Sequence, residues 1–182
     1  MRKLAGALCA AAVALPVSLL AAPAEAAGGV SCSSLEGNEV WSPPLPSRSD
    51  RKSKPTITIR GARLTKCTSS GGAVKRGTVN AKIKWLDPGN CDTLMTYTPG
   101  EAEPRIKGTI TIAWNTGTKS IVAVSLRRTK PYVQKISGRV TGGKFTGSTF
   151  GVHLLMDPPE GACDTKPLTT VPFHGLTKLV IK

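Results

Sequence analysis

The chain has few of the residues on which enzyme chemistry usually depends. Of its 182 residues, 11 are Asp or Glu and 2 are His, and aromatic residues make up only 4%. No Ser lies in a G-x-S-x-G sequence, so the nucleophile elbow of the α/β-hydrolases is absent. The glycine pairs Gly71-Gly72 and Gly142-Gly143 lack the Lys-Ser/Thr of a phosphate-binding loop. We therefore assign no catalytic residue and favour a protein that is not an enzyme.

Long apolar runs are also scarce, and the one present lies at the N-terminus. A basic pair, Arg2-Lys3, precedes the apolar residues 4–22, and Ala24-Glu25-Ala26 then offers small residues at the two positions that a signal peptidase reads. We expect a signal peptide over residues 1–26, cleaved after Ala26, and a secreted, extracellular protein. No second run reaches the length of a membrane span, so we expect no transmembrane segment in the mature chain.

The cysteines indicate disulfides rather than a metal site. The sequence has 5 Cys, and Cys9 leaves with the signal peptide. The mature chain keeps Cys32, Cys67, Cys91 and Cys163. Four cysteines in an exported protein indicate two disulfides, for which three connectivities are possible. No C-x-x-C sequence is present, and the spacings match no zinc site.

Proline is concentrated between Cys32 and the first alternating stretch. Residues 42–55 hold Pro43, Pro44, Pro46 and Pro55 among charged and polar residues. Because proline has no backbone N–H to donate, we predict that this stretch is a solvated connector and not a central strand. The mature chain then divides into an N-terminal segment at 27–55 and a β-domain at 56–182.

From residue 56 onward, apolar and polar residues alternate with the period of two that half-buried strands show. We predict a hairpin across Gly142-Gly143 and strands over 56–60, 78–85, 105–114, 119–127, 149–156 and 176–181. No segment has the apolar period of a capped helix. The sequence therefore predicts an all-β protein, a single antiparallel β-sandwich that is Ig-like in the broad sense, with a β-barrel as the main alternative.

Several short motifs accompany the signal peptide, Cys32 and Cys163. They are Leu64-Thr65-Lys66-Cys67, Asn90-Cys91, Thr111-Ile112-Ala113-Trp114-Asn115-Thr116-Gly117 and Gly143-Lys144-Phe145-Thr146-Gly147. This combination resembles the small exported β-proteins of unknown function that are common in actinomycetes. The resemblance spans most of the mature chain. It implies export and a sandwich fold, and it carries no active site.

Two loops share the same order of residues. Residues 86–93 and 156–165 each run from an apolar residue through Asp-Pro and Gly to Cys-Asp-Thr, and each follows a predicted strand. We expect two strand-end loops at one pole of the fold, joined by Cys91–Cys163. Cys32–Cys67 would then fasten the N-terminal segment, although the other two connectivities stay open.

That pairing would gather several carboxylates in a basic protein. Closely spaced carboxylates and turn carbonyls are the ligands that coordinate a calcium ion. Neighbouring carboxylates can also act as acid and base in a hydrolase. Asp beside Pro or Gly is equally an ordinary turn residue. No other cofactor is indicated. The candidate calcium ligands are Asp87, Asp92, Asp157, Glu160 and Asp164.

Basic residues occupy the polar positions of the predicted strands, and the chain carries a formal net charge of +14. Such a surface attracts anions. Trp85 and Trp114 fall on the apolar parity, so stacking platforms are lacking and we expect no sequence-specific nucleic acid. The candidate anion-binding residues are Lys82, Lys84, Lys107, Lys119, Arg127, Arg128 and Lys130.

We therefore expect a monomeric binding module for an anionic cell-surface or extracellular polymer, such as an acidic polysaccharide or a teichoic acid. One alternative is a hydrolase that uses the Asp/Glu loops. Another is a secreted protease inhibitor that presents residues 42–54.

Overall fold

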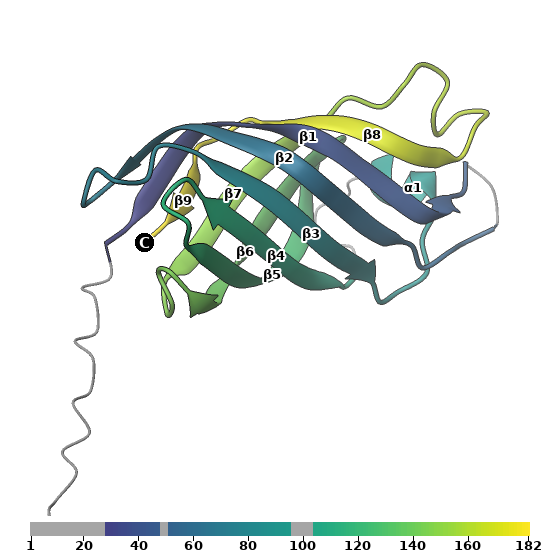
Figure 1. The fold of residues 1–182 in the computed structure, drawn as a ribbon. Helices are drawn as coiled ribbons and strands as arrows, with labels where there is room; N and C mark the ends of the chain where they lie inside the picture. The colour runs from purple at the N-terminus through teal and green to yellow at the C-terminus, as the bar shows by residue number, and fades with distance from the viewer. Residues whose placement is uncertain (1–27, 48–50, 96–103) are drawn as a thin grey trace, which may run out of the picture.

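The computed structural model describes residues 28–47, 51–95 and 104–182. These residues are almost entirely β-strand, with one short helix, α1 (Cys91–Met95) (Figure 1). The strands are β1 (Val30–Leu45), β2 (Thr56–Ser69), β3 (Gly77–Trp85), β4 (Ile106–Trp114), β5 (Lys119–Lys130), β6 (Val133–Gly143), β7 (Thr149–Met156), β8 (Leu168–Gly175) and β9 (Leu179–Ile181).

The strands form one antiparallel sheet that closes into an eight-stranded barrel. β1 to β8 follow one another around the barrel in chain order, and β1 pairs with both β2 and β8. β9 takes the place of β8 between β1 and β7 at the end of the barrel where β1 begins. The all-β prediction is confirmed. The sandwich prediction is wrong, because β1 joins the two edges that a sandwich would leave open.

β1 is the strand that the sequence does not predict. It takes up much of the segment expected to be a connector, and it includes Pro43 and Pro44. These prolines lie beyond Ser42, the last residue of β1 that pairs with β2, and inside a break of register with β8. A missing N–H costs no ladder hydrogen bond there, so proline is tolerated at the end of this strand.

Two other elements differ from expectation. β6 continues through Gly142 to Gly143, and residues 144–147 form the turn to β7, so the predicted hairpin turn lies further along the chain. Phe145 has a φ of 67° in this turn, which a strand could not accommodate. β8 has buried Val171 and Phe173 with the exposed Pro172 between them, and this proline hides the alternation.

Side chains that alternate along the strands fill the barrel. On β3, Val79, Ala81, Ile83 and Trp85 are buried, while the residues between them are exposed. The buried residues of β3 pair with buried residues of β4, and these in turn pair with β5, so inward side chains form rows across the strands. The interior is therefore a packed core of aliphatic and aromatic side chains, and the wall presents the polar positions to solvent.

Two disulfides fasten the barrel, in the expected pairing. Cys32–Cys67 links paired positions of β1 and β2, and Cys91–Cys163 links α1 to the loop after β7. They span 35 and 72 residues, so each would stabilise the fold by about 3–4 kcal/mol by restricting the unfolded chain. Disulfides are consistent with an oxidising, extracellular environment.

The predicted signal peptide lies outside the described residues. Within those residues, no helix has the length and apolar character needed to cross a membrane.

Candidate functional site

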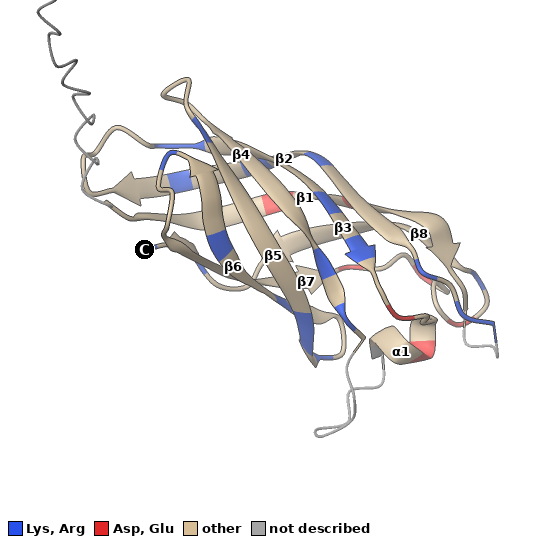
Figure 2. Ribbon diagram, turned by 90° about the horizontal axis from the view of Figure 1, so that it is seen from below, with Lys and Arg blue, Asp and Glu red and all other residues tan. Residues whose placement is uncertain are grey.

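Charged side chains divide between the wall of the barrel and one of its ends (Figure 2). β2 to β6 carry Lys and Arg, and none of the strands from β2 to β9 carries Asp or Glu. We call the end that holds α1 and Cys91–Cys163 the α1 end. Apart from Glu36 and Glu39 of β1, the acidic residues in the described ranges belong to α1 and the adjoining loops: Asp87, Asp92, Asp157, Glu160 and Asp164.

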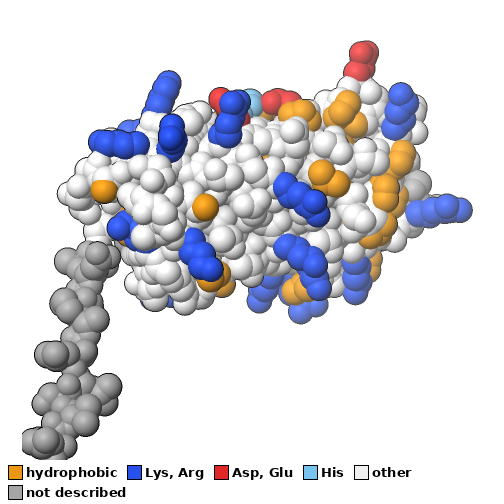
Figure 3. Space-filling model, in the orientation of Figure 1, with side chains coloured by type: hydrophobic (Ala, Val, Ile, Leu, Met, Phe, Trp, Pro, Cys, Tyr) orange, Lys and Arg blue, Asp and Glu red, His pale blue; other side chains and the backbone are white. Residues whose placement is uncertain are grey.

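The wall brings like charges together across neighbouring strands. Lys84 of β3 lies directly opposite Lys107 of β4, and Arg127 of β5 lies directly opposite Lys135 of β6. With Lys82, these exposed residues form what we call the basic face. No ion pair within the described ranges engages any of them. Figure 3 shows Lys and Arg side chains spread over the wall, with acidic groups along its upper edge.

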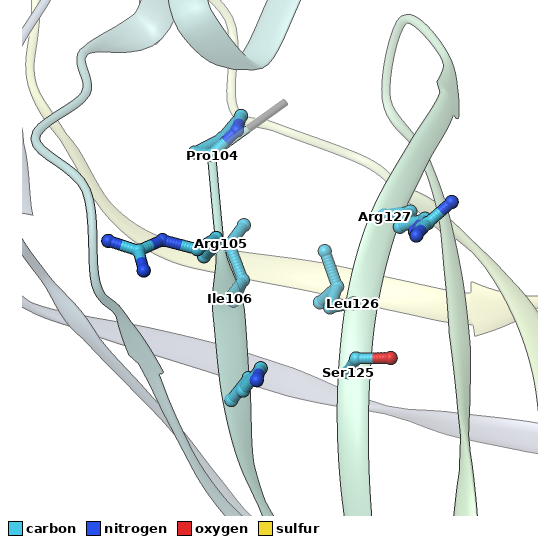
Figure 4. Close-up of a pocket in the computed structure, with 7 residues that line it drawn as sticks. Pro104, Arg105, Ile106, Ser125, Leu126 and Arg127 are labelled. Carbon is cyan, nitrogen blue, oxygen red and sulfur yellow. The ribbon is translucent and has the colours of Figure 1, made fainter. Parts of the chain in front are cut away.

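A cleft of about 480 Å³ opens between β4 and β5 at the α1 end (Figure 4). Its lining includes three residues whose side chains point outward from the strands, Lys107, Ser125 and Arg127. It also includes two whose side chains point inward, Ile106 and Leu126. Figure 4 shows Ile106 and Leu126 between the two strands, with Arg127 extended away from them. The cleft therefore lies over the end of the paired β4 and β5 strands, beside the basic face.

A shallower hollow of about 380 Å³ lies on the wall over β2, β3 and β4. Its polar lining includes Arg60, Asn80, Lys82 and Thr109. It extends the basic face away from the α1 end with hydrogen-bonding groups that carry no negative charge.

Most of the predicted anion-binding residues lie on the outer wall. Lys82, Lys84, Lys107, Lys119, Arg127 and Lys130 are all exposed. Arg128 is only 8% exposed, because strand alternation turns it inward beside the outward Arg127. It is therefore not part of the exposed surface, which corrects its assignment. Lys119 begins β5 and pairs with Ala113, so it lies at the opposite end of the strand from Arg127.

Lys135 of the basic face was not predicted. The sequence predicts no strand over residues 133–138, because Ser137 and Gly138 interrupt the apolar pattern of β6. The signal that could have found Lys135 is the even spacing of Ile136 and Val140, which puts the odd-numbered positions of β6 on the outer side.

The acidic loops do meet at the α1 end, but Asp87 and Asp157 are held by separate partners. Arg105 donates to Asp87 through Nε at 3.1 Å, a terminal nitrogen at 2.9 Å and its backbone N–H at 2.8 Å. These hydrogen bonds lower the pKa of Asp87 to about 2. Asp157 Oδ2 lies 2.9 Å from His174 Nδ1. An aspartate that stays ionised cannot act as the general acid of a hydrolase.

The structure gives the calcium prediction no support. In residues 28–47, 51–95 and 104–182, no three His, Cys, Asp or Glu side chains are grouped so that they could hold a metal ion. The shared disulfide brings the loops together, but in the part of the chain that the structure describes it groups no three such side chains. Of the candidate inhibitor loop at 42–54, residues 42–45 belong to β1, and residues 48–50 lie outside the described ranges.

Comparison with protein-family models, curated proteins and solved structures finds no match to this chain. The resemblance to exported actinomycete proteins therefore stays a prediction, and function has to be argued from the barrel itself.

Proposed function

We propose that this protein is a binding module for an anionic extracellular polymer, which it holds on the basic face. One observation carries the proposal: Lys84/Lys107 and Arg127/Lys135 are like-charge pairs on a wall whose strands β2 to β9 lack carboxylates. Like charges directly opposite each other destabilise a sheet. A polyanion lying across the strands would relieve that repulsion.

The arrangement suits a repeating anion. Directly opposed residues of neighbouring antiparallel strands lie about 5 Å apart, and successive outward residues of a strand lie about 7 Å apart. The face therefore offers several cations at the spacing of charged groups along a polymer. Binding would be driven by the release of counterions and would tolerate variation in the polymer.

An acidic polysaccharide or a teichoic acid is the favoured polymer. Sequence-specific nucleic-acid binding is disfavoured, because Trp41, Trp85 and Trp114 are buried at 2–4% exposure and cannot stack on bases. The two disulfides favour an extracellular setting, where such polymers occur.

The test compares two double variants with equal loss of charge. Lys84→Ala with Lys107→Ala removes one pair of the basic face. Lys178→Ala with Lys182→Ala removes two exposed cations beside β9, on the other side of the barrel. Calorimetry with polyglycerol phosphate and with a carboxylated polysaccharide should show about tenfold weaker binding for the first variant only, which corresponds to about 1.4 kcal/mol. An equal loss in both variants would mean that net charge, not the face, governs binding.

A further inference from the structure

The cleft between β4 and β5 is surrounded by cations on both sides. Lys107 of β4 lies directly opposite Ser125 of β5, and both side chains point outward. Arg105 stands two residues before Lys107, and Arg127 stands two residues after Ser125, so they occupy the two sides of the cleft nearer the α1 end (Figure 4). One cavity of about 480 Å³ is therefore lined by three cationic side chains and a hydroxyl group.

Two of these cations are available to a ligand. Arg105 is already paired, because it donates to Asp87 from Nε at 3.1 Å and from a terminal nitrogen at 2.9 Å. No ion pair within the described ranges engages Lys107 or Arg127. The Arg105–Asp87 pair is close to neutral, so the charge that the cleft offers comes from Lys107 and Arg127.

The neighbouring strands add to this charge. Lys84 of β3 lies directly opposite Lys107, and Lys135 of β6 lies directly opposite Arg127. Cations thus follow one another across β3, β4, β5 and β6, which are adjacent in the barrel. The cleft lies in the middle of this line, so an anion attracted to the basic face meets the cleft at its centre.

Ser125 supplies a hydrogen-bond donor beside the two cations. Its side chain is half-buried, and in the described part of the chain no printed contact engages its hydroxyl group. Ser137 lies directly opposite Ser125 on β6 but does not line the cleft. An ammonium, a guanidinium and a hydroxyl group around one cavity suit an anion that has several acceptor oxygens.

We propose that this cleft binds a phosphomonoester group through Lys107, Arg127 and Ser125. Above its second pKa of about 6, a phosphomonoester carries nearly two negative charges on three acceptor oxygens. Two cations match that charge, the guanidinium fork binds two oxygens, and the hydroxyl group binds the third. A carboxylate, a sulfate ester or a phosphodiester carries a single negative charge and leaves one cation unmatched.

The cleft also has room for what the phosphate is attached to, since cavities of roughly 300–1,000 Å³ hold small organic ligands. The inference rests on the proposed function, because Lys107 and Arg127 belong to the basic face, and it names the group that this face prefers. That phosphate belongs either to the end of the polymer or to a free small molecule.

Calorimetry on the folded protein at about pH 8, where a phosphomonoester is a dianion, tests the charge match. Glycerol 1-phosphate is compared with dimethyl phosphate, a phosphodiester with one negative charge. We expect saturable binding of one glycerol 1-phosphate, at least about tenfold tighter than the binding of dimethyl phosphate. Equal affinities, or no saturable binding of glycerol 1-phosphate, would overturn the proposal.

Two variants that keep the net charge locate the site. Ser125→Ala removes the hydroxyl group, and Arg127→Lys replaces the guanidinium fork with a single ammonium group. We expect each to weaken the binding of glycerol 1-phosphate about tenfold. Ser137→Ala makes the same change just outside the cleft and should have no effect. Equal effects of the two serine variants, or no effect of both Ser125→Ala and Arg127→Lys, would also overturn the proposal.

Polyglycerol phosphate, with its terminal phosphate intact or removed by a phosphatase, identifies the source of the phosphate. Tighter binding of the intact polymer, lost in Ser125→Ala, would assign the cleft to the polymer's end. Binding of glycerol 1-phosphate without that difference would assign it to a free small molecule. Ser125→Ala keeps every cation of the basic face, so it should bind the dephosphorylated polymer as the parent protein does. Polymer binding without glycerol 1-phosphate binding would contradict the cleft alone, and the reverse result would contradict only the basic face as a polymer site.

Discussion

Lys84 and Lys107 face each other directly across the β3–β4 ladder, and neither strand holds a carboxylate. A folded protein gains nothing in stability from such a pair, because opposed like charges repel. The pair makes sense on a surface whose charge serves binding. Stability and binding should then respond in opposite directions when the pair is altered.

Lys107→Glu tests that opposition. The new carboxylate would face Lys84, so we expect the free energy of unfolding to rise by up to about 1 kcal/mol at low salt. Affinity for polyglycerol phosphate should fall, because the basic face gains a negative charge. Urea unfolding and calorimetry on the same preparation measure the two effects.

Lys178→Glu is the matched control for that variant, since Lys178 is exposed and lies outside the basic face. It should leave both quantities nearly unchanged. If Lys107→Glu proves less stable than the parent protein, or binds the polymer as tightly, the interpretation of the Lys84/Lys107 pair is wrong.

The interior carboxyl group predicts an unusual dependence of stability on pH. Burial raises the pKa of Glu39 from 4.5 to about 7, and the Gln134 and Trp41 side chains oppose this rise in part. The residues paired with Glu39 on β2 and β8 are Ile59 and Val171, which do not titrate. Arg128 is the charged side chain that faces the interior beside Gln134.

The folded protein therefore binds the Glu39 proton more tightly than the unfolded chain does. This contribution is fully present below about pH 4.5 and is lost as pH rises through about 7, a decrease of about 3 kcal/mol. Urea unfolding at about pH 5 and about pH 8 should show the loss in the parent protein but not in Glu39→Gln. An equal loss in that variant would assign the pH dependence to other groups.

Regular alternation made β3, β4, β5 and β7 predictable from the sequence, and the repeated loop order made the disulfide pairing predictable. β1 was not predictable, because Glu39 points inward where a charged residue normally marks the outer face, and because its last residues include prolines. Without β1, the sheet appears open, and an open sheet suggests a sandwich. Pairing of one strand with two distant partners is a tertiary property that no local pattern contains.

The residues of the candidate site were likewise predictable where strand alternation is regular and not predictable where the closed barrel decides their position. Parity alone placed Lys82, Lys84, Lys107 and Arg127 on the outer wall, as the structure has them. The inward turn of Arg128 needed the true length of β5, which runs beyond the predicted end at residue 127. The convergence of Glu39 and Gln134 needed the closed barrel.

Trp85 and Trp114 should respond differently to the same substitution. Both are buried, but only Trp114 has a hydrogen bond for its indole N–H. Trp→Phe removes the same volume at either site, so the difference between the variants reports the hydrogen bond. We expect Trp114→Phe to cost about 1 kcal/mol more than Trp85→Phe in thermal or urea unfolding. Equal costs would show that the Trp85 N–H is also satisfied in solution.

Asp87 should titrate well below the usual range. Hydrogen bonds from Arg105 lower its pKa from 3.8 to about 2. The stabilising contact is therefore complete above pH 3.8 and is lost as pH falls through about 2. Arg105→Ala should return the pKa toward 3.8 in an NMR titration of the carboxyl carbon. A titration near 3.8 in the parent protein would contradict the observed pair and would reopen a role for Asp87 in acid–base chemistry.

The central claim is that the basic face binds a polyanion electrostatically, and the salt dependence of binding tests it most directly. The affinity of the protein for polyglycerol phosphate is measured between about 50 and 200 mM salt. We predict a linear decrease of the logarithm of affinity with the logarithm of salt concentration, with a shallower slope for Lys84→Ala with Lys107→Ala than for Lys178→Ala with Lys182→Ala. Binding that is absent at low salt, or that does not change across this range, would contradict the account.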